Sequence, residues 1–302
     1  MISRSRQTPA TVPAASPATV RATAHVHSEW SDDGSWPLER IAATFGRVRC
    51  RVVLMSEHSR GFTAAKWQEY VQACAAASTD RVTLVPGIEY GDDDDVVHVP
   101  VWGRVPFFGE APAIAHLLAG VSEAGGTAVW AHPWRRDAWR RFDPAWAPYL
   151  GAVEVWNRKY DGIAPNRRSV ELSRRHQARP FVALDFHNRR QLFPLSLALR
   201  LGHAGQPSQD AAALRPEPAL TAARAATAGL AGTAGSAAAP PVPGFPPGRG
   251  PVTPDDVYAA LSAGRFAPRA LGLPLGPLTG GLPAAALRTL ESGRRLAARL
   301  VG

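Results

Sequence analysis

The feature that most constrains the fold is a unit that repeats from residue 23 onward, in which a short apolar run is followed by a polar residue and then by a helical pattern. Apolar runs of strand length stand at 23–27, 51–55, 82–85, 87–90, 96–102, 127–130, 152–156 and 181–184. Helical spacing occurs at 37–45, 63–77, 111–124 and 165–176. Strands that alternate with helices pair in parallel through right-handed crossovers. About seven such units predict an α/β fold, a distorted (β/α)7 TIM-like barrel.

Composition divides the rest of the chain. Residues 1–22 are rich in Pro, Ala, Ser and Thr without periodicity, which predicts a disordered N-terminal arm, and the barrel is expected over 23–203. Residues 204–251 are mostly Ala, Gly and Pro with scattered Arg, which favours a linker or a disordered insertion because proline cannot continue a helix or a central strand. Residues 252–302 are expected to form C-terminal helices, the first of which, 253–263, would complete the barrel.

Residues that bind metals gather where the apolar runs end. They include six of the nine histidines, and the set is His25, His27, His58, Glu89, His98, His132, Asp185 and His187. The carboxyl ends of parallel barrel strands meet on one face, where active sites form. Imidazoles and carboxylates buried together are costly to desolvate unless they surround metal ions. Nitrogen and oxygen donors suit Zn²⁺, Mn²⁺ or Fe²⁺, and the number of ligands predicts two or three ions.

Short motifs containing these residues follow one another along the chain. They are H-V-H-S-E-W-S-D-D-G at 25–34, Ser56-Glu57-His58, Gly87-Ile88-Glu89 with His98 downstream, Ala131-His132-Pro133, Glu154 with Asn157, Leu184-Asp185-Phe186-His187 and A-L-S-A-G-R at 260–265. As an ordered set they resemble the motifs of the PHP (polymerase and histidinol phosphatase) family of metal-dependent phosphoesterases. The resemblance covers about residues 23–190. It implies a PHP-type barrel with its metal site at the carboxyl ends of the strands.

The resemblance also implies how the ligands are shared. One ion would be held by His25, His27, Glu89 and Asp185; a second would be held or bordered by His58 and His187 with Asp32 or Asp33; a third would be held by Glu89, His98 and His132, with Glu89 bridging. The motif carries one extra acidic residue before Gly34, so both aspartates are candidates, and the register from His27 favours Asp32.

Residues that bind substrate or transfer protons are less well defined by the sequence. Arg135 and Arg158 follow strand ends and are candidates to bind a phosphate, although each could instead pair with a carboxylate at the rim. Asn157 is a third candidate for substrate binding. Either Asp32 or Glu57 could pass a proton to the leaving oxygen, and the sequence does not choose between them.

Charge leaves several partners open. The chain has a formal net charge of +9, which favours phosphate or nucleic-acid partners but is equally typical of the residue usage of a GC-rich genome. The acidic run at 92–95 lacks the spacing of a calcium loop and predicts a solvated turn. The Trp- and Arg-rich segment 130–146 could stack nucleobases, although packing is the preferred interpretation.

These observations predict a phosphoesterase that hydrolyses a phosphomonoester, either a nucleotide or a small metabolite phosphate, with metal-activated water. One alternative is an exonuclease of the same chemistry that acts on short oligonucleotides. Another is a non-catalytic, metal-stabilised module that binds nucleic acid. Cys50 and Cys74 are isolated, and no signal peptide or spanning segment is found, so a cytoplasmic protein without a membrane partner is expected.

Overall fold

The computed structural model describes residues 19–202 and 252–301. The linker predicted for 204–251 lies outside the described residues, as does the predicted arm up to residue 18. Residues 19–22, which composition assigned to the arm, instead begin the first strand. They pair with a strand near residue 200, a long-range partner that local composition does not indicate.

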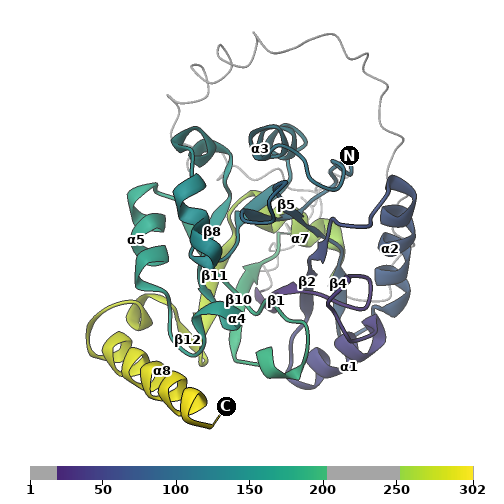
Figure 1. Cartoon of the computed structure of the whole chain (residues 1–302). Helices are drawn as coiled ribbons and strands as arrows, with labels where there is room; N and C mark the ends of the chain where they lie inside the picture. The colour runs from purple at the N-terminus through teal and green to yellow at the C-terminus, as the bar shows by residue number, and fades with distance from the viewer. Residues whose placement is uncertain (1–18, 203–251, 302) are drawn as a thin grey trace, which may run out of the picture.

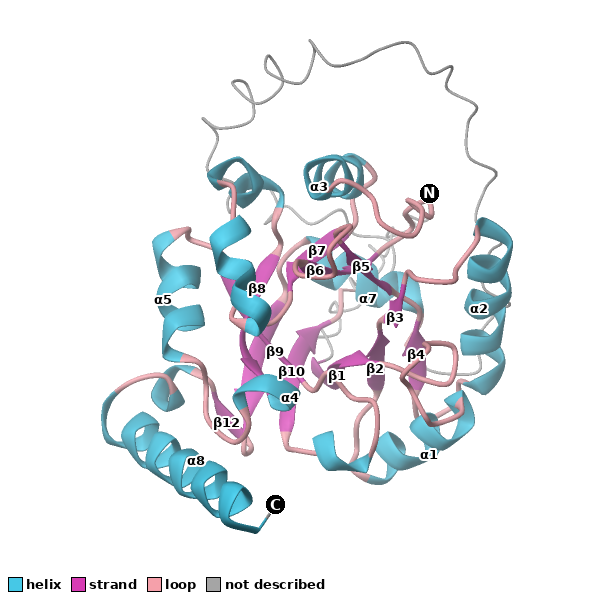
Figure 2. Ribbon diagram, in the orientation of Figure 1, coloured by secondary structure: helices cyan, strands magenta, loops and turns pink. Residues whose placement is uncertain are grey.

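The described residues contain two six-stranded sheets (Figures 1 and 2). The first has the order β12-β11-β10-β1-β2-β4 and the second the order β3-β5-β6-β7-β8-β9. The strands are β1 (Thr19–Val26), β2 (Val52–Met55), β3 (Glu57–His58), β4 (Thr83–Val85), β5 (Ile88–Gly91), β6 (His98–Trp102), β7 (Thr127–Trp130), β8 (Ala152–Asn157), β9 (Arg179–Ala183), β10 (Leu195–Arg200), β11 (Phe266–Ala270) and β12 (Leu273–Pro274).

Helices stand around the outside of the sheets (Figure 2). They are α1 (Leu38–Arg47), α2 (Ala64–Ala77), α3 (Ile114–Glu123), α4 (Arg158–Asp161), α5 (Arg167–Arg175), α7 (Pro254–Ser262) and α8 (Gly281–Val301), with short 3₁₀ turns η1 (Arg135–Arg141), η2 (Pro144–Tyr149), η3 (Arg189–Gln191) and η5 (Gly276–Leu278). Among the described residues, no helix combines the length and the apolar character needed to cross a membrane.

Strand directions differ in part from the predicted all-parallel arrangement. Pairing is parallel for β1-β2-β4, β3-β5 and β7-β8-β9. It is antiparallel for β5-β6-β7, and β10 runs antiparallel to both β1 and β11. The turn between β5 and β6 is too short for the crossover helix that parallel strands need, so these strands form a hairpin. The fold is therefore mixed α/β with two sheets, and the closed barrel stays a prediction.

The core lies between the strands and the surrounding helices. In β2 the four residues Val52–Met55 are all buried, as expected for a parallel strand that is covered on both faces. The aromatic rings of Trp102 and Phe181 stack within this core, with centroids 5.8 Å apart. The loop after β9 in the second sheet joins the end of β1 in the first, because the Phe186 backbone N–H donates to the His25 carbonyl and Phe186 O accepts from His27 N.

The C-terminal segment adds a strand as well as helices. Thr253 caps α7 through a reciprocal pair of hydrogen bonds with Asp256, and the Tyr258 hydroxyl donates to the Pro86 carbonyl at 3.0 Å. The β11 strand then pairs with β10. Sequence composition indicated only the helices of this segment, because a five-residue strand containing Pro268 has a weak pattern.

Candidate metal centre

The six histidines of the predicted set lie together in one cluster. Ring centroids are 5.1 Å apart for His25 and His27, 4.2 Å for His27 and His187, and 5.1 Å for His98 and His132. They come from the ends of β1, β3 and β7, the start of β6 and the loop after β9. Residues more than 150 positions apart in sequence therefore form one cluster, which no local segment could build alone.

Glu89 is the centre of this cluster. Its carboxylate is 1% exposed and lies near five imidazoles. The distances from its oxygens are 3.1 Å to His25, 3.6 Å to His27, 3.2 Å to His58, 3.0 Å to His98 and 3.2 Å to His132. A carboxylate has two oxygens with about four lone-pair sites, so it can serve more than one cation at once.

Second contacts orient two of the histidines. The Glu154 carboxylate lies 2.7 Å from His25 Nδ1, and the Ser31 hydroxyl lies 3.2 Å from His27 Nδ1. With Nδ1 engaged, the Nε2 atoms of His25 and His27 point toward Glu89 and Asp185. Both Nε2 atoms are buried and form no hydrogen bond among the described residues. Buried ring nitrogens aimed at carboxylates without a hydrogen bond fit the ligands of a divalent cation.

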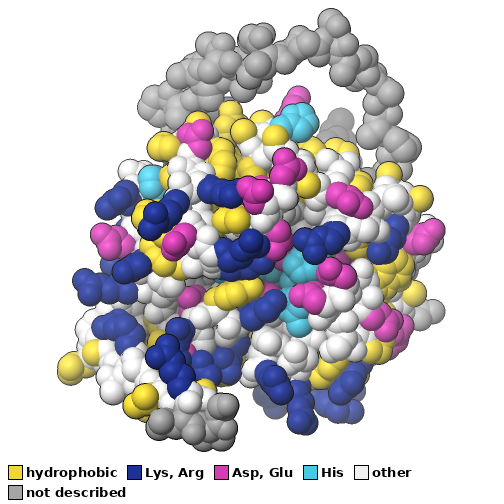
Figure 3. Space-filling model, viewed as in Figure 1, with side chains coloured by type: hydrophobic (Ala, Val, Ile, Leu, Met, Phe, Trp, Pro, Cys, Tyr) yellow, Lys and Arg dark blue, Asp and Glu magenta, His cyan; other side chains and the backbone are white. Residues whose placement is uncertain are grey.

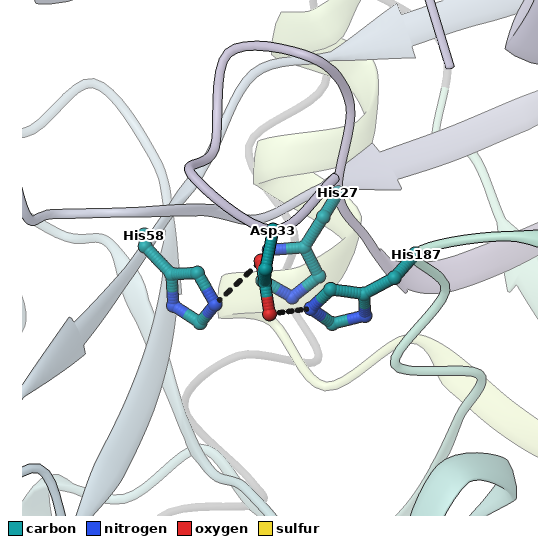
Figure 4. A group of neighbouring side chains, drawn as sticks. All are labelled: His27, Asp33, His58 and His187. Carbon is teal, nitrogen blue, oxygen red and sulfur yellow. Dashed lines mark ion pairs between the residues drawn. The ribbon is translucent and has the colours of Figure 1, made fainter. Parts of the chain in front are cut away.

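A second donor group lies beside the first. His27, Asp33, His58 and His187 place ligand atoms within 4.8 Å of one another, and Figure 4 shows Asp33 between His58 and His187. Asp33 oxygens lie 3.2 Å from His58 Nε2 and 2.8 Å from His187 Nε2. Sequence register favoured Asp32, but Asp32 instead lies toward Arg60, at 3.5 Å. The loop after His27 turns, so strand register no longer predicts which aspartate faces inward.

Three further donor groups share residues with these. They are His25-Glu89-His132, His25-His27-Asp185 and His58-Glu89-His98. His25, His27, His58 and Glu89 each belong to two of the four groups, so cations held by these groups would be close neighbours. Each group offers only nitrogen and oxygen donors.

The backbone is unusual at three of these residues. His25, His132 and Asp185 have φ values of 61°, 27° and 49°, a left-handed region that residues other than glycine seldom adopt. The parallel pairing of β1 with β2 also shifts register between Ala24 and Val26, which places His25 in a bulge. The convergence of His25 and His27 therefore depends on this bulge and not on simple alternation along a strand.

The charges of the cluster are consistent with ionised carboxylates. Burial opposes ionisation of Glu89, but the neighbouring His25 and His98 outweigh it and hold the Glu89 pKa well below its usual value. For Asp185 burial is likewise outweighed, chiefly by His25 and Lys159, and its pKa falls to about 2. Burial, with His58 and His187 nearby, lowers the pKa of His27. Burial disfavours charge on His25 and His98, but Glu89 and the other carboxylates outweigh it and raise both pKa values, that of His98 to about 9. Protons on these two rings balance the carboxylates, and bound divalent cations would take their place.

A cavity of about 380 Å³ opens over the cluster. Its walls include Asp32, Asp33, Arg60, Arg135, Lys159 and Tyr160 as well as three of the histidines, His58, His98 and His132. Lys159 was missed by sequence reasoning: its Nζ lies 3.1 Å from His187 Nε2 and 3.3 Å from Asp185 Oδ1. Burial disfavours its charge, but Asp185 and other neighbours raise the Lys159 pKa. Lys159 is a cation that faces the metal ligands.

Only one of the three residues predicted to bind substrate lines this cavity. Arg135 does so, although it donates to Asp95 Oδ2 at 2.8 Å and to the Tyr160 hydroxyl at 3.0 Å. Arg158 stacks over the Phe193 ring, on another side of α4. Asn157 is fully buried and donates to Glu154 and Asp185. Lys159, one residue further along the chain, lines the cavity, whereas Arg158 was expected to do so.

Glu57 also departs from its predicted role. Its carboxylate is fully buried and accepts hydrogen bonds from the Ser28 backbone N–H and the hydroxyls of Ser28, Ser31 and Tyr70. It does not line the cavity. Burial raises the Glu57 pKa, an effect that these donors reduce. Glu57 therefore supports the loop after β1 and does not face the cavity.

The acidic run and the tryptophan-rich segment have mainly structural contacts. Asp92 and Asp94 each pair with Arg141 at 2.7 Å. Asp95, however, reaches the cluster, at 2.7 Å from His98 Nε2, which the interpretation as a solvated turn missed. Trp130 is buried and stacks on Phe142 with centroids 4.9 Å apart, as the packing interpretation predicted.

Comparison with known proteins finds a likeness of fold. No family model and no curated protein matches the sequence. A proposed metal-dependent phosphoesterase from Bifidobacterium adolescentis has 18% identity over 56% of this chain and 88% of that chain, with a TM-score of 0.42. A two-domain protein from Bacteroides vulgatus with a proposed PHP-like metal-dependent phosphoesterase has 14% identity over 66% and 64%, with a TM-score of 0.46. A lesion-specific endonuclease from Pyrococcus furiosus has 12% identity over 61% and 53%, with a TM-score of 0.42.

Proposed function

We propose that this protein is a hydrolase that cleaves a phosphomonoester at a site holding two or three divalent metal ions. The observation that carries the proposal is Glu89, one buried carboxylate surrounded by five imidazoles and shared between donor groups. Closely spaced divalent ions supply Lewis-acid chemistry: they activate water and neutralise the charge of a phosphoryl group.

The ligands would be divided among the overlapping groups. His25, His27, Glu89 and Asp185 would serve one ion, and His58, His187 and Asp33 would serve or border a second. Glu89, His98 and His132 would serve a third. Imidazole and carboxylate donors without thiolate suit Mn²⁺, Zn²⁺ or Fe²⁺.

The chain's own residues bind and orient the substrate. Lys159 is held beside Asp185 and His187 and carries a positive charge toward the cavity, so it can bind the phosphoryl oxygens. Glu154 and Ser31 hold the rings of His25 and His27 in one orientation, which keeps their Nε2 atoms directed at the cluster. Arg135 is tied to Asp95 and Tyr160 and forms a fixed wall of the cavity. Asp32 lies at the rim, and proton transfer to the leaving oxygen stays a prediction for it.

The cavity supports a small substrate in preference to a nucleic-acid strand. Its volume of about 380 Å³ matches one small ligand. Its outer lining includes Asp93 and Glu110, while Asp32 pairs with Arg60 and Asp92 pairs with Arg141. A polynucleotide backbone needs an extended basic groove, which this mixed lining does not supply.

The test is metal analysis combined with a substrate panel. Purified protein loaded with Mn²⁺, Zn²⁺ or Fe²⁺ would be assayed against an aryl phosphate, nucleoside monophosphates, sugar phosphates and a 5′-labelled single-stranded oligonucleotide. We expect at least two metal equivalents in the wild type and hydrolysis of monoesters that is lost in His132→Ala. Protein that binds no metal and hydrolyses nothing would refute the proposal. Preferential trimming of the oligonucleotide would replace it with the exonuclease, and salt-sensitive binding without hydrolysis would indicate the nucleic-acid-binding module.

A further inference from the structure

Lys159 and Tyr160 are carried by a single helical turn, α4, that is held from two sides. At its start, the Asn157 side chain caps the turn by accepting from Lys159 N at 3.0 Å and from Tyr160 N at 3.3 Å. A four-residue helix has too few internal hydrogen bonds to be stable alone. Its geometry therefore depends on what contacts its far end.

That far end contacts the C-terminal helix α8, which lies at the edge of the molecule (Figure 1). Glu291 accepts from the Ile163 backbone N–H at 3.0 Å. Arg295 donates to the carbonyls of Tyr160 at 3.1 Å and Asp161 at 3.4 Å. Arg295 also pairs with Glu291 at 2.6 Å, so the two side chains are linked to each other and together bind the end of α4.

Gly162, which lies between these contacts, allows the Glu291 carboxylate to approach the backbone closely. Gly162 has a φ of 74°, and a Cβ at this position would overlap the Glu291 carboxylate. Glycine is therefore needed both for the backbone conformation and for the space that Glu291 occupies. Glu291 is 6% exposed, although most of its helix is exposed to solvent.

The rest of the α8 interface has few buried apolar side chains: Ala284 is fully buried and Leu287 packs in part against the core. Leu282, Leu290 and Leu296 are 86%, 61% and 60% exposed, so these leucines contribute little to docking. A cavity of about 270 Å³ remains where α8 meets the segment after α4, lined among others by Asp161, Asn166 and Arg288. The polar contacts of Glu291 and Arg295 consequently hold α8 to this part of the molecule. In Figure 3 dark blue side chains gather over this corner, in keeping with the arginines of α8.

We propose that Glu291 and Arg295 are positioning residues for the active site: from α8 they fix the end of α4, so that Lys159 and Tyr160 face the cavity. The inference rests on the proposed function, because it assumes that Lys159 binds the phosphoryl group. It makes a helix far along the chain part of the phosphate-binding machinery without contact to the substrate.

The test is a double-mutant cycle between Glu291 and Lys159 in the metal-loaded, full-length protein. Glu291→Ala is expected to lower kcat/KM for the best monoester about 10-fold and to weaken inorganic phosphate binding similarly, a size typical of coupling between linked residues. In the Lys159→Met background the same substitution should change either quantity less than about 2-fold. Arg295→Ala should reproduce the effect, and Arg299→Ala, an exposed arginine near the end of the same helix, should not.

Hydrogen–deuterium exchange of residues 157–163 provides a readout that needs no substrate. Faster exchange there in Glu291→Ala and Arg295→Ala, with β1 and β9 unchanged, is expected if α8 holds α4. Unchanged exchange would overturn the inference even if the protein is a phosphoesterase. Equal losses of activity in both Lys159 backgrounds would also overturn it, because Glu291 would then act through general stability. If no substrate is hydrolysed, the proposed function fails while the exchange result still decides whether α8 positions α4.

Discussion

Two buried glutamates on neighbouring strands have opposite surroundings. Glu89 on β5 faces five imidazoles, whereas Glu57 on β3 receives hydrogen bonds only from backbone and hydroxyl groups. In the parallel pairing of these strands, Glu89 lies opposite His58 and Glu57 lies opposite Ile88. Since successive side chains of a strand point to opposite faces, one residue of offset sends Glu57 away from the cavity.

The difference shows how surroundings decide what a buried carboxylate does. Imidazoles outweigh burial and lower the pKa of Glu89, whereas among neutral donors burial prevails and raises the pKa of Glu57. Glu89 is thus a ready metal ligand. Glu57 instead acts through a neighbour: it accepts from the Ser31 hydroxyl at 2.6 Å, and that hydroxyl lies 3.2 Å from His27 Nδ1.

Neutralising Glu89 is expected to have the largest effect of the substitutions that test this difference between Glu89 and Glu57. Glu89→Gln is expected to lower kcat/KM by at least about 10³-fold and to weaken metal binding, because two of the four donor groups lose a charged oxygen. Elemental analysis and steady-state kinetics measure both effects. Glu171→Gln on the exposed face of α5 is the control. Retained metal with near-normal activity would mean that Glu89 is structural, like Glu57.

The surroundings of Glu154 are intermediate between those of Glu89 and Glu57. Its carboxylate contacts His25 Nδ1 at 2.7 Å and also accepts from the neutral donors His132 N and Asn157 Nδ2. Glu154→Gln should weaken metal binding or activity about 10- to 100-fold, the range for residues that orient metal-ligating histidines. Metal titration by calorimetry tests this. An effect as large as that of Glu89→Gln would instead make Glu154 a direct ligand.

Asp32 and Asp33 lie on one loop but differ in the same way, because only Asp33 contacts the histidines. Asp33→Asn should lose metal and about 10-fold or more in kcat/KM, because Asp33 lies between His58 and His187. Asp32→Asn should keep its metal and hydrolyse an aryl phosphate within about 3-fold, since an aryl leaving group needs little proton donation. If Asp32 transfers the proton, the variant loses more with an alkyl phosphate. Equal behaviour of the two variants would contradict the placement of Asp33.

For Glu57 the expected effect is on stability. Glu57→Gln should reduce the free energy of unfolding by about 1–3 kcal/mol, because the amide cannot accept from all the donors that now surround the carboxylate. Activity per folded molecule should fall less than about 10-fold, through the looser hold on His27. Urea denaturation and kinetics on the same preparation separate the two effects. Full stability with abolished activity would restore a direct catalytic role for Glu57.

Asp161 is a further buried carboxylate, and its raised pKa should make the stability of the protein depend on pH. Burial raises its pKa from 3.8 to about 7; Glu154 adds to the rise, and hydrogen bonds from Asn157 and Asn166, together with Arg295, limit it. A pKa raised by folding contributes stability that is complete below pH 3.8 and is lost as pH rises through about 7. The stability of wild type relative to Asp161→Asn should therefore fall between pH 5 and pH 8. Urea midpoints of both proteins at the two pH values test this, and a constant difference would contradict it.

Local patterns predicted much of the secondary structure. The strand at 127–130 is confirmed residue for residue, and the helix at 63–77 is confirmed with Thr63 as its cap. The sequence did not reveal β10 and β11, because their stability comes from antiparallel pairing with distant segments. The predicted direction of β6 was also wrong, because β6 runs antiparallel to both β5 and β7. Apolar runs carry no information about strand direction.

By itself, the sequence determined which residue types lie at or near the strand ends. The histidines, Glu89 and Asp185 belong to short motifs that can be read from neighbouring residues alone. Only the tertiary structure decided that Asp33 and not Asp32 faces His58, that Glu57 points away, and that Lys159 faces the cavity while Arg158 does not. The physical reason is that a bulge, a turn or a one-residue offset rotates a side chain to another face. Such rotations are set by packing against distant segments, which spacing along the chain does not record.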